Sequence, residues 1–342
     1  MKVDVIVGGT PSEVGAAARD AEEVGLDGVF VAETSHDPFL PLVPAALSTQ
    51  RVQVGTSIAV AFARTPMAVA VLANDLQLCS EGRFVLGLGS QIAAHVTKRF
   101  SMPWSKPAAR MREFVLAMRA VWAAWNEGTP LDFRGDFYAH TLMTPVFNPG
   151  PNPFGMPKVF LAGVGARMTE VAGEVADGFF VHPFTTEQYM REETLPAVQR
   201  GLDSAGRARS TLEVSYPVFV VTGRDDAELA ENAQPVKQQL AFYASTPAYV
   251  GVLEKHGWGD AHPVLHALSK QGEWKRMADV FDDEMLNAFA VVGEPAAIGV
   301  EVQRRYGDLA DRVTPAMPYE PAGDVRRDVL DAIRAAAVGP SY

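Results

Sequence analysis

Short apolar runs typical of β-strands alternate with helical segments along almost the whole chain. Parallel strands need a long crossover connection, usually a helix, so this alternation predicts an α/β fold with a parallel sheet. Eight such units in 342 residues fit a (β/α)8 TIM-like barrel, which takes about 250 residues before insertions. The eight predicted strands are residues 3–7, 28–32, 52–62, 83–88, 158–163, 178–181, 213–221 and 312–317.

The junctions between helix and strand repeat. The segments EVGLDGVFV (23–31) and EVADGFFV (174–181) share a helix end, an Asp-Gly pair and an aromatic β run. DLADRVTP (308–315) is a looser third copy. Asp-Gly is a common turn and recurs by chance, but each copy follows a helix and precedes a strand, which favours one repeated structural unit.

Two stretches fall outside the repeating pattern. Residues 90–157 contain the run LDFRGDFY, which predicts a hairpin, and residues 230–290 are mostly helical in pattern. Neither stretch has a linker-like composition at its edges. We therefore expect a single barrel domain over residues 1–342, with insertions near 90–157 and 230–290.

The charge balance narrows the classes of partner. Asp and Glu total 41 against 30 Lys and Arg, a net charge of −11, which disfavours nucleic acid or an anionic membrane surface as the main partner. No apolar run approaches the roughly 18 residues that a membrane helix requires, and Asp4 interrupts any signal-peptide core. Cys79 is the single cysteine, which excludes an internal disulfide. Together these features predict a cytoplasmic protein.

The run RFVLGLGSQIAAH (83–95) looks at first like a dinucleotide-binding loop. That fingerprint needs a third glycine and an acid about 20 residues further on. Here the third position is Ile92, no acid follows at that spacing, and the run is the fourth strand rather than the first. Gly87 and Gly89 instead lie at the C-terminal end of a barrel strand, where chemistry is placed and where glycine lets a flat ring approach the backbone.

Five stretches, through their order and spacing, resemble the luciferase-like oxidoreductase superfamily of flavin- and deazaflavin-dependent barrels. Within it, ETSHDPFLP after the second strand and GLGSQ after the fourth are most similar to the branch that uses coenzyme F420, an 8-hydroxy-5-deazaflavin. The five stretches are GTSIAVAFARTP (55–66), RFVLGLGSQ (83–91), REF with FRGDFY (112–114 and 133–138), KVFLAGVGARMTEVAGEVADGFF (158–180) and FAVVGEP (289–295).

The resemblance implies a cofactor lying across the C-terminal mouth of the barrel. Ser57 and Ile58 fall where the family has a bulge and a non-proline cis peptide behind the ring, although the residues alone indicate an ordinary buried strand. The turn 162–167 is implied to hold the cofactor phosphate at a helix N-terminus, where backbone N–H groups favour anions; the residues alone indicate a short βα turn. The predicted cofactor-binding residues are Thr34, Ser57, Ile58, Ala59, Gly87, Gly89, Ser90, Ala162, Gly163, Val164, Gly165, Arg167 and His182.

The catalytic residues are less defined. Glu33 follows the second strand, over the expected ring face, where a carboxylate can bond the ring edge or the substrate. The sugar-phosphate dehydrogenases of this branch have a catalytic His and Glu that align with Ser35 and Ile92, so that specific chemistry is not expected. His36, Gln91 and His95 are the candidate replacements, with loop capping as the alternative role for the residues after the second strand.

We expect an oxidoreductase that transfers a hydride between coenzyme F420 and a small organic substrate of unidentified class. Two alternatives stay open: an FMN-dependent monooxygenase of the same superfamily, and a deazaflavin-binding barrel without turnover. No metal site is expected, because the first strand ends in IVGGT without the histidine pair that metal-dependent barrels use. The family expectation for assembly is a homodimer.

Overall fold

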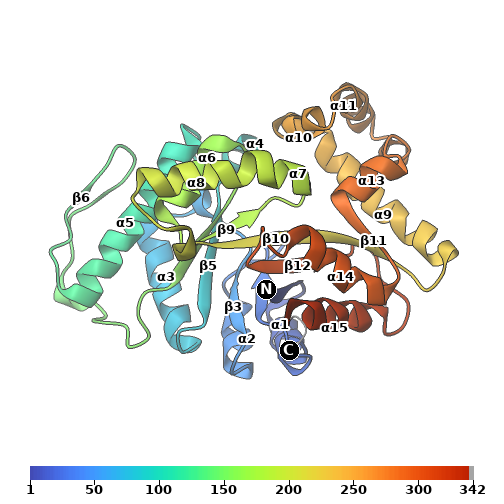
Figure 1. Cartoon of the computed structure of the whole chain (residues 1–342). Coiled ribbons are helices and arrows are strands. Elements are labelled where there is room, and N and C mark those ends of the chain that lie inside the picture. The colour runs from blue at the N-terminus through green and yellow to red at the C-terminus, as the bar shows by residue number, and fades with distance from the viewer. Residues whose placement is uncertain (339–342) are drawn as a thin grey trace. The chain divides into compact units, whose positions relative to one another are not determined.

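The computed structural model describes residues 1–338, and its strands form a closed eight-stranded parallel barrel with flanking helices, as predicted (Figure 1). Val, Ile, Leu and Phe dominate these strands because both faces of a parallel sheet are buried. The strands are β1 (Lys2–Val7), β2 (Gly28–Val31), β3 (Gln53–Thr56), β4 (Ala59–Val60), β5 (Phe84–Gly89), β6 (Phe133–Arg134), β7 (Ala139–His140), β8 (Lys158–Gly163), β9 (Gly178–Val181), β10 (Glu213–Thr222), β11 (Ala290–Gly293) and β12 (Arg312–Ala316).

Helices connect most successive strands. They are α1 (Pro11–Glu23), α2 (Leu42–Ser48), α3 (Pro66–Cys79), α4 (Ala93–Lys98), α5 (Pro107–Glu127), α6 (Ala166–Val175), α7 (Glu187–Tyr189), α8 (Leu195–Ser204), α9 (Asp226–Ala244), α10 (Val250–Lys255), α11 (Ala261–Gln271), α12 (Trp274–Ala278), α13 (Asp283–Phe289), α14 (Pro295–Tyr306) and α15 (Val325–Val338).

The chain divides into two compact units, which we describe separately. The N-terminal unit comprises Asp4–Phe180 and Ala197–Glu213, and the C-terminal unit comprises Met1–Val3, Val181–Pro196 and the described residues from Val214 on. In the N-terminal unit, β1, β2, β3, β5 and β8 form consecutive parallel ladders. In the C-terminal unit, the first residues of β1 pair in parallel with β12, Lys2 with Arg312 and Val3 with Val313.

The repeated Asp junctions have one structural role in all three copies. The carbonyls of Asp27, Asp177 and Asp311 each accept the N–H of the residue that opens the next strand around the barrel, at 2.9, 3.0 and 2.9 Å. The Asp177 and Asp311 carboxylates also accept an N–H from the strand on their other side. The Asp therefore sets the register between neighbouring strands, which explains why the junction recurs.

The prediction of one continuous strand over 52–62 is wrong in its detail. The strand breaks after Thr56, passes through a cis peptide between Ser57 and Ile58, and resumes as β4. Around the break, the Ser57 N–H donates to the Val31 carbonyl at 2.8 Å and the Glu33 N–H donates to the Ile58 carbonyl at 3.1 Å. The family resemblance therefore located this break correctly, whereas the apolar pattern of the residues did not show it.

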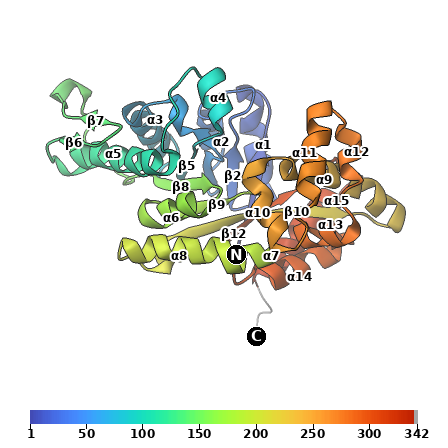
Figure 2. The ribbon, with the colours of Figure 1, turned by 90° about the horizontal axis from the view of Figure 1, so that it is seen from above.

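The insertion at 90–157 carries the predicted hairpin, whose strands β6 and β7 pair antiparallel beside α5 (Figure 2). The Glu113 carboxylate on α5 accepts the N–H groups of Asp136, Phe137 and Tyr138 at 2.6–2.9 Å. The motifs REF and FRGDFY thus contact one another directly. Gly135 permits this contact, because a side chain there would collide with the Glu113 carboxylate.

In the C-terminal unit, β10 forms parallel ladders with two strands. Ser215–Phe219 align with β12, and Phe219–Thr222 align with β11. The sequence pattern did not identify β11, because its four residues follow α13 directly without a turn signal. The predicted helical stretch 230–290 contains α9 to α13, which gather on one side of this unit (Figure 2).

Candidate functional site

The partly exposed side chains of Ile58 and Ala162 form an apolar platform near the C-terminal ends of the strands in the N-terminal unit. Phe30, Val85, Phe160 and Phe180, one from each of four strands, form a buried cluster inside the barrel. Ile58 and Ala162 pack against this cluster and keep part of their surface exposed. Two predicted cofactor residues from distant parts of the sequence are thereby brought onto one surface.

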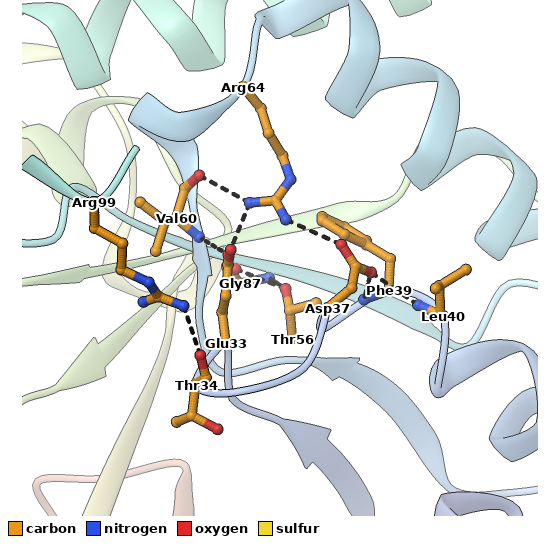
Figure 3. A network of polar contacts seen from close by, with 10 residues as sticks. All are labelled: Glu33, Thr34, Asp37, Phe39, Leu40, Thr56, Val60, Arg64, Gly87 and Arg99. Atoms are coloured by element: carbon orange, nitrogen blue, oxygen red, sulfur yellow. Dashed lines mark hydrogen bonds and ion pairs between the residues drawn. The ribbon is translucent and has the colours of Figure 1, made fainter. Parts of the chain in front are cut away.

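Gly87 and Gly89 have a packing role beneath this platform. A side chain on Gly87 would collide with the Thr56 carbonyl and with the Phe180 ring, and one on Gly89 would approach Ile58 to 2.7 Å. The Thr56 hydroxyl also donates to the Gly87 carbonyl at 2.6 Å and accepts the Gly87 N–H at 2.9 Å (Figure 3). These glycines let β5 pack closely against Thr56 and Ile58, which fixes the segment that carries Ile58 and Ala59.

Glu33 supports the segment that carries Ile58 and Ala59. One carboxylate oxygen accepts the Val60 N–H and the Arg64 guanidinium, both at 2.7 Å (Figure 3). Arg64 also contacts Asp37 at 3.1 Å and lies over the Phe39 ring at 5.2 Å. Glu33 is thus committed to N–H donors on the protein, which favours a positioning role over the catalytic role predicted for it.

Residues 34–37 of the loop after β2 are exposed. The Thr34 carbonyl accepts a hydrogen bond from Arg99 at 2.7 Å, which ties this loop to the chain beyond α4 (Figure 3). Ser35 and His36 are exposed. His36 therefore has the freedom that a proton-transferring group on a mouth loop needs.

The residues after β5 are held mainly by local contacts. Gln91 has a positive φ of 59°, and its side-chain oxygen accepts the N–H of Ile92 at 3.0 Å. The Ser90 hydroxyl donates to the Gln91 carbonyl at 3.1 Å. His95 is exposed on α4. The catalytic roles predicted for Gln91 and His95 stay predictions.

The turn between β8 and α6 presents unused backbone donors. Gly165 caps α6 with φ +80° and open space around it, and no side chain caps the helix. The N–H groups of Gly165, Ala166 and Arg167 donate to no group among residues 1–338. A helix start of this kind attracts an anion. The Arg167 guanidinium, however, pairs with Glu170 at 2.7 Å rather than closing over the turn.

His182 belongs to the C-terminal unit, where aromatic rings surround it. Its ring stacks on the Tyr249 ring, with the two ring centroids 4.3 Å apart. It also makes a T-shaped contact with the Tyr243 ring, whose centroid lies 5.0 Å away. Its Nδ1 accepts the Phe184 N–H at 3.1 Å, which assigns the proton of the neutral ring to Nε2. Burial lowers the pKa of His182 to about 4, so at neutral pH the ring is an uncharged donor.

Two arginines of the N-terminal unit that make partly buried contacts were not identified from the sequence. Arg64 lies inside the motif GTSIAVAFARTP, but its pairing with a glutamate 31 positions earlier depends on the fold. Arg110 lies in the insertion, and nothing in the sequence marks it as buried. Within residues 1–338, no three His, Cys, Asp or Glu side chains gather as a metal-binding group, and no helix is long and apolar enough to cross a membrane.

These features make the chain a (β/α)8 barrel of the TIM class, a fold in which function is placed at the C-terminal ends of the strands. The chain belongs to the luciferase-like monooxygenase family, which its sequence matches over residues 3–337.

Known proteins similar to this chain include F420-dependent ones. The chain is 55% identical over 311 residues to an uncharacterized protein of Mycobacterium tuberculosis, covering 90% of this chain and 92% of that one. It is 26% identical to the 5,10-methylenetetrahydromethanopterin reductase of Archaeoglobus fulgidus, covering 92% and 91% of the two chains. The coenzyme F420 dependent tetrahydromethanopterin reductase of Methanopyrus kandleri has the same fold, with a TM-score of 0.78, 19% identity and 97% of each chain covered.

Proposed function

We propose that the protein is an F420-dependent oxidoreductase that transfers a hydride between the deazaflavin and a small organic substrate. The observation that carries this proposal is the arrangement around the end of β8. Ala162 belongs to the apolar platform, and three residues further on Gly165 opens the uncapped helix α6. A flat apolar ring and a phosphate on one ligand match those two surfaces.

The protein residues supply orientation rather than electron chemistry. Ile58 and Ala162 would lie against the ring, and the N–H groups of Gly165, Ala166 and Arg167 would hold the phosphate. When bound, the deazaflavin supplies the hydride at its C5. Glu33 and Arg64 fix the strand segment under the ring, because the Glu33 carboxylate holds the Val60 N–H.

A proton must move at the substrate when a hydride does. With Glu33 held by Arg64, the exposed imidazoles of His36 and His95 are the groups of the mouth loops that are free to give or take it. His36→Gln and His95→Gln would each separate this role from binding. The substitution at the residue that carries the proton should lower kcat without weakening cofactor binding, whereas the other substitution should leave kcat unchanged.

Cofactor titration tests the assignment. Purified protein would be titrated separately with F420 and with FMN, each followed by its own fluorescence. Preferential binding of F420, with bleaching of the bound oxidised cofactor when an oxidisable substrate is added, is the expected result. Preferential binding of FMN would replace the proposal by the monooxygenase alternative, and F420 binding without bleaching across substrate classes would favour a binding barrel without turnover.

We also propose that the protein acts as a homodimer in the cytoplasm. The packed helices α2 and α3 expose large apolar side chains, including Leu47, Val71 and Leu78, which a second copy would cover. The single cysteine, Cys79, is free, in keeping with a reducing compartment.

A further inference from the structure

Arg110, in the first turn of α5, is a buried cation without an acidic partner. Its residue surface is only 6% exposed. Among residues 1–338, no carboxylate lies within ion-pair distance of its guanidinium. Burying a charge is costly unless it is paired, and a cation at the positive end of a helix adds to that cost.

The contacts that Arg110 does make leave part of its guanidinium unused. Nε donates to the Tyr138 hydroxyl at 2.8 Å, and Nη1 donates to the Pro103 carbonyl at 2.6 Å. The rings of Phe62 and Tyr138 lie 4.6 and 5.6 Å from the guanidinium carbon. Nη2 has no partner among the described residues, yet it is not among the fully enclosed unpaired atoms. It therefore remains within reach of a ligand.

The nearest acid along the helix does not neutralise Arg110. Both oxygens of Glu113 are occupied by the backbone N–H groups of the hairpin, Asp136 to Tyr138. The Tyr138 hydroxyl accepts from Arg110, so its own proton is free to donate. Arg110 and Tyr138 together present two donors with no anion between them.

These donors lie close to the platform in the N-terminal unit. Phe62, which packs on the guanidinium, follows β4 and is four residues from Ile58. Trp104, on the loop before α5, makes a T-shaped contact with Phe62, and the two ring centroids lie 5.8 Å apart. An anion at Arg110 would therefore sit among aromatic rings beside the mouth of the barrel.

We propose that Arg110 and Tyr138 form a subsite for an anionic oxygen group, a carboxylate or a phosphate, on the molecule that binds at the mouth. This inference rests on the proposed function, and where the anionic group belongs to the substrate it narrows the substrate class to anionic compounds. The anionic group belongs either to the substrate or to the side chain of the cofactor, and the experiment separates these sources.

The test measures binding of benzoate and of its neutral isostere benzamide to the whole chain by calorimetry, without cofactor. Benzoate is expected to bind at least roughly tenfold more tightly than benzamide, since a charge-assisted hydrogen bond contributes more than a neutral one. Arg110→Gln should weaken benzoate binding by roughly tenfold or more, and Tyr138→Phe by a smaller factor. Arg112→Gln, the same change on an exposed arginine of α5 paired with Glu174, should leave it unchanged.

Tyr138→Phe keeps the ring that packs on Phe114, so it tests the subsite even where Arg110→Gln does not fold. Equal binding of benzoate and benzamide, no benzoate binding, or wild-type affinity in Tyr138→Phe would each overturn the proposal. Competition between F420 and benzoate would assign the anion to the cofactor, and independent binding would assign it to the substrate. A chain that binds benzoate but not F420 refutes the proposed function alone, and one that binds F420 but not benzoate refutes the subsite alone.

Discussion

The carboxylate of Glu33, 6% exposed, meets the guanidinium of Arg64, 17% exposed, at 2.7 Å. The same oxygen holds the Val60 N–H. This pair joins the end of β2 to the segment after β4, on which the platform depends. Burial makes its loss more costly than that of a surface pair.

Glu33→Gln should lower the free energy of unfolding by about 2 kcal/mol, because the amide oxygen still accepts the Val60 N–H but leaves Arg64 without its buried counter-charge. Asp37→Asn, which removes the exposed partner of the same arginine, should cost less than about 1 kcal/mol. Urea unfolding of the two variants measures the difference. Equal losses would show that the Glu33 contact has no special weight.

Ala166→Pro should weaken F420 binding without weakening the fold. Proline is favoured at the first position of a helix, and the change removes one N–H from the proposed phosphate site. One charge-assisted hydrogen bond is worth about 1.5 kcal/mol, or roughly tenfold in affinity. Asp226→Pro, at the first position of α9, is the matched control. Unchanged F420 affinity in Ala166→Pro would place the phosphate elsewhere.

Gly87→Ala should destabilise the barrel by roughly 3 kcal/mol, because the added methyl group meets a backbone carbonyl and a buried ring that have little room to shift. Gly8→Ala, at an exposed position with nothing within 4 Å of the new atom, should change stability by less than about 0.5 kcal/mol. Thermal and urea unfolding both report the contrast. A tolerated Gly87→Ala would contradict the packing role.

His182 should make the protein less stable as the pH falls. Burial holds its pKa at about 4 in the folded state, against 6.5 in the unfolded chain. Between pH 6.5 and 4 the imidazole of His182 is therefore protonated in the unfolded state and neutral in the folded state. The contribution of the neutral ring is complete above pH 6.5 and falls by about 3 kcal/mol by pH 4.

The variant His182→Asn isolates this effect, because the amide oxygen can replace Nδ1 as acceptor for the Phe184 N–H. Its stability difference from the wild type, measured in urea at pH 7, 5.5 and 4.5, should shrink steadily with acidity. Ser35→Asn, which changes an exposed residue without a titratable side chain, should show a constant difference. A constant difference for His182→Asn as well would mean that the ring takes up a proton in the folded state at its usual pH.

Leu47→Glu should shift the protein towards the monomer, because it puts a charge on the face that we assign to a second copy. Val300→Glu makes the same kind of change at a residue of equal exposure, 68%, on α14. Sedimentation velocity over a range of concentrations separates the two. Dissociation by Val300→Glu instead would move the interface to α14.

Local pattern predicted the barrel well because each parallel strand carries its own signature. The predicted bounds 158–163 and 178–181 agree with β8 and β9 to the residue, since buried apolar runs end sharply at Gly or Asp. The kink after Thr56 came from family resemblance, because the residues around it look like any buried strand. Arg64 and Arg110 were not identified from the sequence, because their partners Glu33 and Tyr138 lie 31 and 28 positions away and come into contact with them only in the folded chain.

The strand β11 has a consequence for how this protein can diversify. Its residues Ala290–Gly293 align with Phe219–Thr222, the last four residues of β10. Residues 223–289 therefore begin where β10 ends and lead back to the same part of that strand. The parallel pairing of β10 with β11 holds the two ends of this stretch together. Exchanging, lengthening or shortening residues 223–289 would therefore keep the pairing of β10 with β11 and with β12, so at this junction the chain can vary in length without a change in its barrel strands.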